Sequence, residues 1–109
     1  MNYSQLSSTL FTLNDKISYL VVINIYGEVI SQYNRGSNVN SPMEEESANQ
    51  LRHIAVATSN LIFENIKFML LEKPNMKIAI INVEEDSLIV GIDKNASWTE
   101  ISEIFNLTV

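Results

Sequence analysis

The sequence predicts an α+β domain in the order α-β-β-α-β-β-β-α, with a five-stranded antiparallel sheet covered by helices on both faces. Three observations lead to this fold class. The chain has 109 residues, the size of one ordinary domain, so residues 1–109 are expected to form a single unit. Apolar residues make up 46% and charged residues 18%, which is a globular composition. Apolar positions repeat with helical spacing in some segments and with strand spacing in others.

The first helix and the first hairpin are predicted from a change in the spacing of apolar residues, from helical to strand spacing. Apolar residues step by three and four from Tyr3 to Ile17, which predicts an amphipathic helix over residues 3–16. The stretch ISYLVVINIYGEVISQYNRG is rich in β-branched and aromatic residues. With a tight turn at Tyr26-Gly27-Glu28, it predicts a hairpin that pairs residues 18–25 with residues 28–34. The first strand is apolar on both faces, so we expect it centrally in the sheet and the second strand outside it.

A long helix is predicted over residues 42–65. Ser41 suits an N-cap, Pro42 suits the first helical position, and the carboxylates that follow favour the positive end of the helix dipole. Leu51 and Ile54 begin one apolar face of this helix. Val56 and Phe63 fall on a second side, so something besides the helix's own sheet is expected to cover them.

The stretch KFMLLE has two interpretations, either the end of the long helix or a strand. A helix extended through it would reach about thirty residues, far above the usual length. Lys73-Pro74-Asn75 is a turn signature, so we predict strands at residues 66–72 and 76–83 around it. Glu84-Glu85-Asp86 then leads to a strand at residues 87–92.

The last helix is predicted to begin with a capping box. Ser97 can bond the amide three residues on while Glu100 reaches back, and the helix continues to Asn106. We expect the long helix to cover one face of the sheet and the two terminal helices the other. Trp98 is expected to pack the last helix onto the sheet, with an exposed interface role as the alternative.

Charge and composition exclude several classes of function. The net charge of −6 disfavours nucleic acid and anionic membrane surfaces as partners. The absence of cysteine excludes disulfides and thiolate chemistry and fits a reducing cytosol. The N-terminus shows no signal peptide, and no apolar run approaches the ~20 residues that span a bilayer. We therefore predict a cytoplasmic protein without membrane insertion.

The sequence contains no catalytic constellation. His53 is the single histidine, and neither a nucleophile elbow nor a phosphate-binding loop is present. Glu84-Glu85-Asp86 with Asp93 lacks the spacing of a calcium loop and is better explained as a solvated turn. We therefore expect no enzyme, no cofactor and no metal.

Taken with the hairpin LVVINIYGEVISQYNRG and the closing segment SLIVGIDKNASWTEI, the element order resembles the roadblock/dynein-light-chain (roadblock/LC7-like) family over nearly the whole chain. Gly27 at the hairpin turn and Asp93 at the end of the last strand match its pattern. Such domains form dimers in which the long helices pair and the first strand of the three-strand meander meets its counterpart. The resemblance implies an interface of six residues, Val56, Phe63, Ile66, Phe68, Met69 and Leu70.

The physics of the strand agrees with a self-complementary interface. The sequence IKFMLL is apolar on both faces, and left open at a sheet edge it would invite aggregation. Pairing with a second copy closes the edge, and two-fold interfaces are the commonest kind.

The expected function is a non-enzymatic homodimeric interaction module or scaffold. By resemblance, it would regulate or adapt a small Ras-like GTPase or another regulatory protein, whose basic patch would meet the acidic surface. The alternative is a PAS- or profilin-like ligand-sensing domain with an apolar pocket, for which Asn24 and Asn82 are the candidate polar groups. The other interpretation of these asparagines is hydrogen bonding near strand ends.

Overall fold

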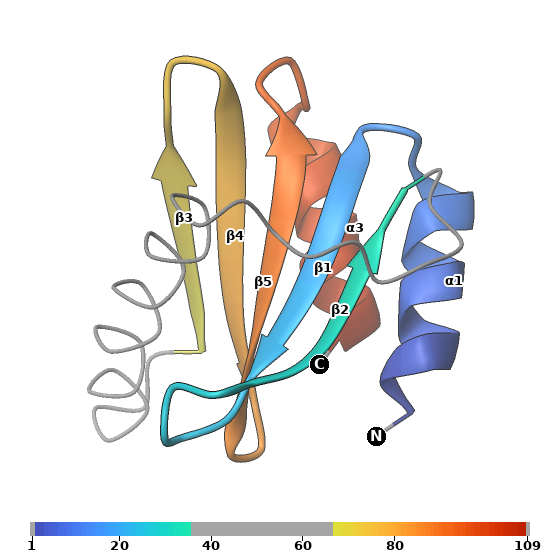
Figure 1. The fold of residues 1–109 in the computed structure, drawn as a ribbon. Helices are drawn as coiled ribbons and strands as arrows, with labels where there is room; N and C mark the ends of the chain where they lie inside the picture. Colours follow the sequence, from blue (N-terminus) through green and yellow to red (C-terminus); the bar gives the residue numbers. More distant parts are fainter. Residues whose placement is uncertain (1, 36–66, 109) are drawn as a thin grey trace.

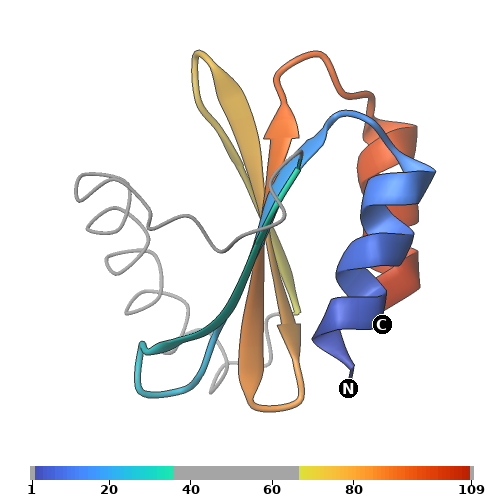
Figure 2. The same ribbon diagram turned by 45° about the vertical axis from the view of Figure 1, so that its right-hand side comes forward.

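The computed structural model describes residues 2–35 and 67–108. They form a five-stranded antiparallel sheet of order β2-β1-β5-β4-β3, and helices α1 and α3 lie side by side on one face (Figures 1 and 2). The elements are α1 (Tyr3–Leu13), β1 (Ile17–Ile23), β2 (Val29–Asn34), β3 (Phe68–Glu72), β4 (Met76–Val83), β5 (Asp86–Asp93) and α3 (Trp98–Thr108). The predicted α+β fold class is confirmed. The predicted long helix over residues 42–65 lies outside the described residues.

Successive side chains along each strand point to opposite faces of the sheet, so the core is divided into two clusters, one on each face. On the face of α1 and α3, Leu20 and Val22 of β1 are buried in one cluster with Ile101 and Ile104 of α3. On the opposite face lies a second buried cluster, which consists of Val21, Ile23, Ile78, Ile80 and Ile89. The predicted first strand with two apolar faces is therefore confirmed, and it lies between β2 and β5.

The first hairpin turns earlier than the sequence predicts. The strand β1 ends at Ile23, and the Asn24 side-chain oxygen accepts the backbone N–H groups of Tyr26 and Glu28, each at 3.0 Å. Gly27 adopts φ +79°, a conformation that suits glycine. Asparagine side chains often accept backbone N–H groups that would otherwise bond to the neighbouring strand. The turn therefore begins at residue 24. Asn24 therefore serves the hairpin as a strand-end group.

The segment FMLLE is a strand, as predicted. It forms β3, which pairs with β4 in an antiparallel register from Phe68↔Ile81 to Glu72↔Lys77. The hairpin between β4 and β5 differs slightly from the prediction. Asp86 belongs to β5, and Glu84 adopts a left-handed turn conformation with φ 56°. The side chain of Ser87 donates to Asn82 at 2.9 Å, so Asn82 also acts near a strand end.

The two helix ends show one correction and one confirmation. Helix α1 stops at Leu13 because the Asn14 side chain accepts the N–H of Lys16 at 2.9 Å and turns the chain toward β1. The capping box of α3 is present: the Ser97 N–H donates to Glu100 at 2.8 Å, and the Glu100 N–H donates to the Ser97 hydroxyl at 3.2 Å. Helix α3 extends past Asn106 to Thr108.

Candidate interaction surface at the sheet edge

The strand β3 forms one edge of the sheet, so its backbone groups alternate between β4 and the side away from β4. The Asn82 N–H donates to Lys67 O at 2.9 Å, and the Lys73 N–H donates to Met76 O at 2.8 Å. With the observed register, the odd-numbered residues of β3 therefore bond to β4. The N–H and C=O groups of Phe68, Leu70 and Glu72 point away from β4.

The four apolar side chains of β3 divide between the two faces of the sheet. Phe68 and Leu70 pack against the cluster under α1 and α3, while Met69 and Leu71 pack against the cluster on the opposite face. All four are half-buried. An edge strand with partly exposed apolar side chains on both faces is a ready template for a further strand.

Of the predicted interface residues, the structure brings Phe68, Met69 and Leu70 together on the edge strand. Val56, Phe63 and Ile66 lie outside the described residues. Leu71 belongs to the predicted apolar strand IKFMLL but not to the six predicted interface residues, and the structure places it with Met69 on the same face.

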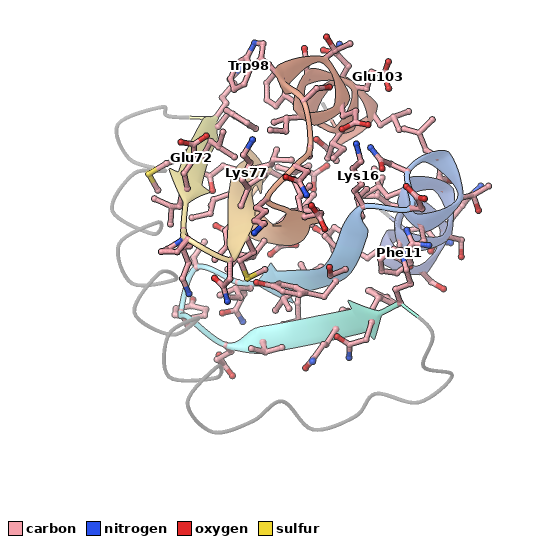
Figure 3. The ribbon with its side chains drawn as sticks, turned by 90° about the horizontal axis from the view of Figure 1, so that it is seen from above. Phe11, Lys16, Glu72, Lys77, Trp98 and Glu103 are labelled. Carbon is pink, nitrogen blue, oxygen red and sulfur yellow. The ribbon has the colours of Figure 1, made fainter. Side chains whose placement is uncertain are left out.

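A row of aromatic rings crosses the helix-side face of this edge. The Phe68 ring lies 5.1 Å from the Phe105 ring and 6.4 Å from the Trp98 ring, both in edge-to-face geometry. Trp98 is the first residue of α3 and is 66% exposed beside β3 (Figure 3). Trp98 therefore contacts the sheet only at its edge through Phe68, and buried Ile101 and Ile104, rather than Trp98, hold α3 on the sheet. The exposed alternative describes its position.

One ion pair and one side-chain hydrogen bond link helices α3 and α1 to the segments beside them. The Lys16 ammonium lies 2.9 Å from the Glu100 carboxylate. The hydrogen bond from Lys16 lowers the pKa of Glu100, and the same bond raises the pKa of Lys16. The Tyr3 hydroxyl donates to Asp86 at 2.5 Å, and burial followed by this bond raises the pKa of Tyr3.

Neither a metal site nor a membrane span is found in the described part of the chain. Within residues 2–35 and 67–108, no group of three or more His, Cys, Asp or Glu side chains is placed to hold a metal ion. Neither α1 nor α3 is long and apolar enough to cross a bilayer.

No family model and no curated protein matches the sequence, whereas solved structures match the fold. MglC from Myxococcus xanthus superposes with a TM-score of 0.74 at 10% identity, over 99% of this chain and 93% of that chain. A Roadblock/LC7 domain from Streptomyces avermitilis gives a TM-score of 0.64 at 17% identity, over 99% and 95% of the two chains. The chain has a roadblock/LC7-like fold.

Gliding protein MglB from Thermus thermophilus shares this fold with a TM-score of 0.66 at 13% identity, over 96% of this chain and 87% of that chain. A further MglB structure, with a TM-score of 0.62, is described as having a tetrameric arrangement. The family resemblance of the sequence is therefore confirmed at the level of the roadblock/LC7-like fold.

Proposed function

We propose that residues 1–109 form a single roadblock-like domain that acts as a non-enzymatic homodimeric interaction module. The observation that carries this proposal is the position of β3 at the edge of the sheet, where no other strand of residues 2–35 and 67–108 pairs with its outer side. Its outward backbone groups are unmatched by β4, and its apolar side chains lie half-buried on both faces. A second copy of the same strand satisfies both needs without any cofactor.

The backbone pattern supports one symmetric way for two copies to pair. The outward-facing residues Phe68, Leu70 and Glu72 are symmetric about Leu70. Two antiparallel copies related by a two-fold axis at Leu70 would therefore place Leu70 opposite its equivalent and Phe68 opposite Glu72. The two sheets would then join into one.

Five residues of edge strand bury less surface than a stable dimer needs, which is at least ~1,000 Å². The proposed interface therefore includes Val56, Phe63 and Ile66 from the preceding segment, as the family resemblance implies. Trp98 and Phe105 extend it on the helix side, where an exposed tryptophan is a favourable interface residue.

For a protein partner, we propose a small Ras-like GTPase or another regulatory protein in the cytoplasm, as the same resemblance implies. The net charge of −6 supports a partner with a basic surface. The likeness to MglB, a gliding protein with a tetrameric arrangement, supports self-assembly. A ligand-sensing function gains no support from Asn24 and Asn82, because both serve hairpins.

The test replaces Leu70 with proline and measures mass in solution by sedimentation velocity. Proline removes the outward N–H of Leu70 but leaves the hydrogen bonds between β3 and β4 in place, which edge strands tolerate. We expect the parent at twice the 12.3 kDa chain mass and Leu70→Pro at the monomer mass. Leu70→Ala keeps the N–H, controls for lost packing and is expected to stay dimeric.

Circular dichroism on Leu70→Pro checks that the sheet remains folded. Lysine substitutions of Phe68 or Leu70 would test pairing less specifically, because both side chains pack against the core cluster and their loss would also destabilise the fold. A folded Leu70→Pro variant with the same mass as the parent contradicts pairing through β3. A monomeric parent contradicts the homodimer itself.

A further inference from the structure

The tip of the β1–β2 hairpin exposes a cluster of apolar side chains at the edge of the sheet opposite β3. Seven large apolar side chains are exposed in the described parts of the chain, and four of them lie between residues 25 and 30. They are Ile25, Tyr26, Val29 and Ile30, with exposed fractions from 39% to 80%. Monomer surfaces scatter such side chains singly, so four exposed large apolar side chains within six residues of one hairpin make its tip a candidate interaction surface.

This cluster, called the hairpin patch below, is separate from the proposed self-association edge. The strand β2 ends the sheet on one side and β3 ends it on the other, with β1, β5 and β4 between them (Figure 1). A second copy paired through β3 therefore leaves the hairpin patch open. The two surfaces can be tested independently.

Carboxylates lie at the same end of the sheet as the hairpin patch. Glu28 belongs to the hairpin itself, and the pairing of Ile23 with both Val29 and Ser87 places the β4–β5 turn at the same end of the sheet. That turn (Figure 1) contains Glu84 and Glu85, and Asp86 follows it as the first residue of β5.

Basic side chains of the described segments gather at the opposite end. The N–H of Arg35 bonds to Ser18 O, the N–H of Asp93 bonds to Lys16 O, and Lys77 pairs with Ile92, so these residues lie where β1 begins and β5 ends. Lys73 and Lys94 flank the same end, next to the paired Met76 and Asp93. Lys67 alone lies at the acidic end, on the far edge beside β3. The hairpin patch therefore lies in a local field that favours cations.

The hairpin patch is also held in a defined shape. Asn24 accepts two backbone N–H groups with its side chain, its own N–H donates to Glu28 O at 3.0 Å, and the Gly27 N–H donates to Asn24 O at 3.0 Å. A preorganised turn loses little entropy when a partner binds. Tyrosine, here Tyr26, is among the residues that most often dominate binding energy.

We propose that the hairpin patch binds a segment of a partner protein in which apolar side chains are flanked by Lys or Arg. The apolar side chains fill the surface of Tyr26, Val29 and Ile30, and the basic side chains meet the carboxylates of Glu28 and the β4–β5 turn. A second copy of this acidic end and an anionic membrane are both repelled by the same charges. This inference rests on the proposed interaction function and names the surface that would carry it.

The experiment selects binders from a displayed random 12-residue peptide library on the full chain. The selected peptides are then measured by fluorescence anisotropy against the parent and two variants. The first variant combines Val29→Ser with Ile30→Ser. The matched control combines Leu13→Ser with Leu107→Ser, since Leu13 and Leu107 are exposed by 49% and 44% against 50% and 47% for Val29 and Ile30.

We expect selected sequences enriched in Lys and Arg beside apolar residues, with affinity that weakens as salt rises. Affinity should fall at least tenfold for the hairpin variant and change less than twofold for the control. A library that yields no binders, or yields acidic binders, overturns the proposal. Binders that tolerate the hairpin substitutions also overturn it.

Sedimentation of the same variants separates this inference from the proposed dimer. The hairpin variant is expected to keep the parent's mass, and a loss of mass would show that a second copy occupies the hairpin patch and overturn the inference. If the parent sediments as a monomer but still binds the peptides, the proposal for the hairpin patch stands and the proposed dimer through β3 is rejected. The two failures are therefore distinguishable.

Discussion

At the scale of single residues, Gly91 shows how closely the central strands are fitted. Gly91 of β5 pairs with Tyr19 of β1, and the Tyr19 ring covers the glycine. A Cβ built on Gly91 would come within 2.5 Å of the Tyr19 Cδ1 and Cζ atoms, closer than carbon atoms pack. Aromatic side chains lying across a strand glycine are a known way to compensate its missing side chain.

We therefore predict that Gly91→Ala destabilises the fold by about 1–3 kcal/mol, since the added methyl group forces the ring and the strand apart. Urea denaturation followed by circular dichroism measures the loss. In a Tyr19→Val background the same substitution should cost much less, because the ring is gone. Equal costs in the two backgrounds would show that the strain lies in the β5 backbone instead.

Two residues show what a sequence cannot specify at this scale. In the sequence, Asn24 looks like a polar residue inside an apolar strand. In the structure its side chain accepts hydrogen bonds from two backbone N–H groups of the turn and so ends that strand. Trp98 reads as a core residue, but the start of α3 places it at the edge of the sheet. Both outcomes depend on where neighbouring elements end, which periodicity defines poorly.

At the scale of elements, the beginning of α3 depends on Glu100, which both closes the capping box and pairs with Lys16 of the segment before β1. The pKa of Glu100 is lowered in the folded protein, so the folded state holds this proton less well than the unfolded state. The stabilisation is therefore complete above the ordinary carboxyl value of 4.5 and is lost as the pH falls through the lowered pKa.

We predict that Glu100→Gln lowers the free energy of unfolding at pH 7 and that the gap from the parent closes on acidification. Glutamine can still accept the Ser97 N–H, so the gap reports mainly the Lys16 pair and the charge at the helix start. Urea titrations from pH 7 to pH 2 measure it. Glu103→Gln is the control on the same helix, because Glu103 is exposed and forms no ion pair with the described residues. A gap that persists unchanged at pH 2 would contradict an electrostatic origin.

The order of the elements was largely predictable because it depends on periodicity and turn chemistry. The strand at FMLLE followed from the turn signature at Pro74 and from the length that a continued helix would have reached. The element ends were less predictable, as the short α1 shows, because the Asn14 side chain competes with the helix for backbone amides.

The candidate site was predictable only in part. An apolar strand at the start of a three-strand meander belongs at an edge, and Phe68, Met69 and Leu70 lie there. Their division between two faces and the aromatic row through Trp98 and Phe105 depend on tertiary packing. The edge position of β2 was predicted, and the sheet order confirms it. The hairpin patch was nevertheless missed, because the exposure of Val29 and Ile30 depends on which faces of the edge strand the neighbouring elements leave uncovered.

At the scale of the whole molecule, the two ends of the sheet differ in charge, and we propose different functions for its two edges. The edge at β3 is apolar and suits a copy of itself, while the hairpin beside the edge at β2 is apolar within an acidic field. A module with one surface for its own copy and another for a partner presents two partner sites per dimer. Bivalent binding of that kind raises avidity without new contacts.

The proposed dimer and single domain together predict a concentration-dependent thermal unfolding. If two copies stabilise each other, folding is linked to association, so Tm should rise by a few degrees for each tenfold increase in protein concentration. Trp98 is the single tryptophan, and its fluorescence reports the β3 edge, whereas far-UV circular dichroism reports the whole chain. The two probes should give one coincident transition at each concentration, because all 109 residues are proposed to fold as one unit.

Leu70→Pro provides the control, since a folded monomer loses the concentration dependence. A parent with a constant Tm would refute the dimer, and a fluorescence transition that precedes the circular dichroism transition would show that the edge around Trp98 unfolds separately.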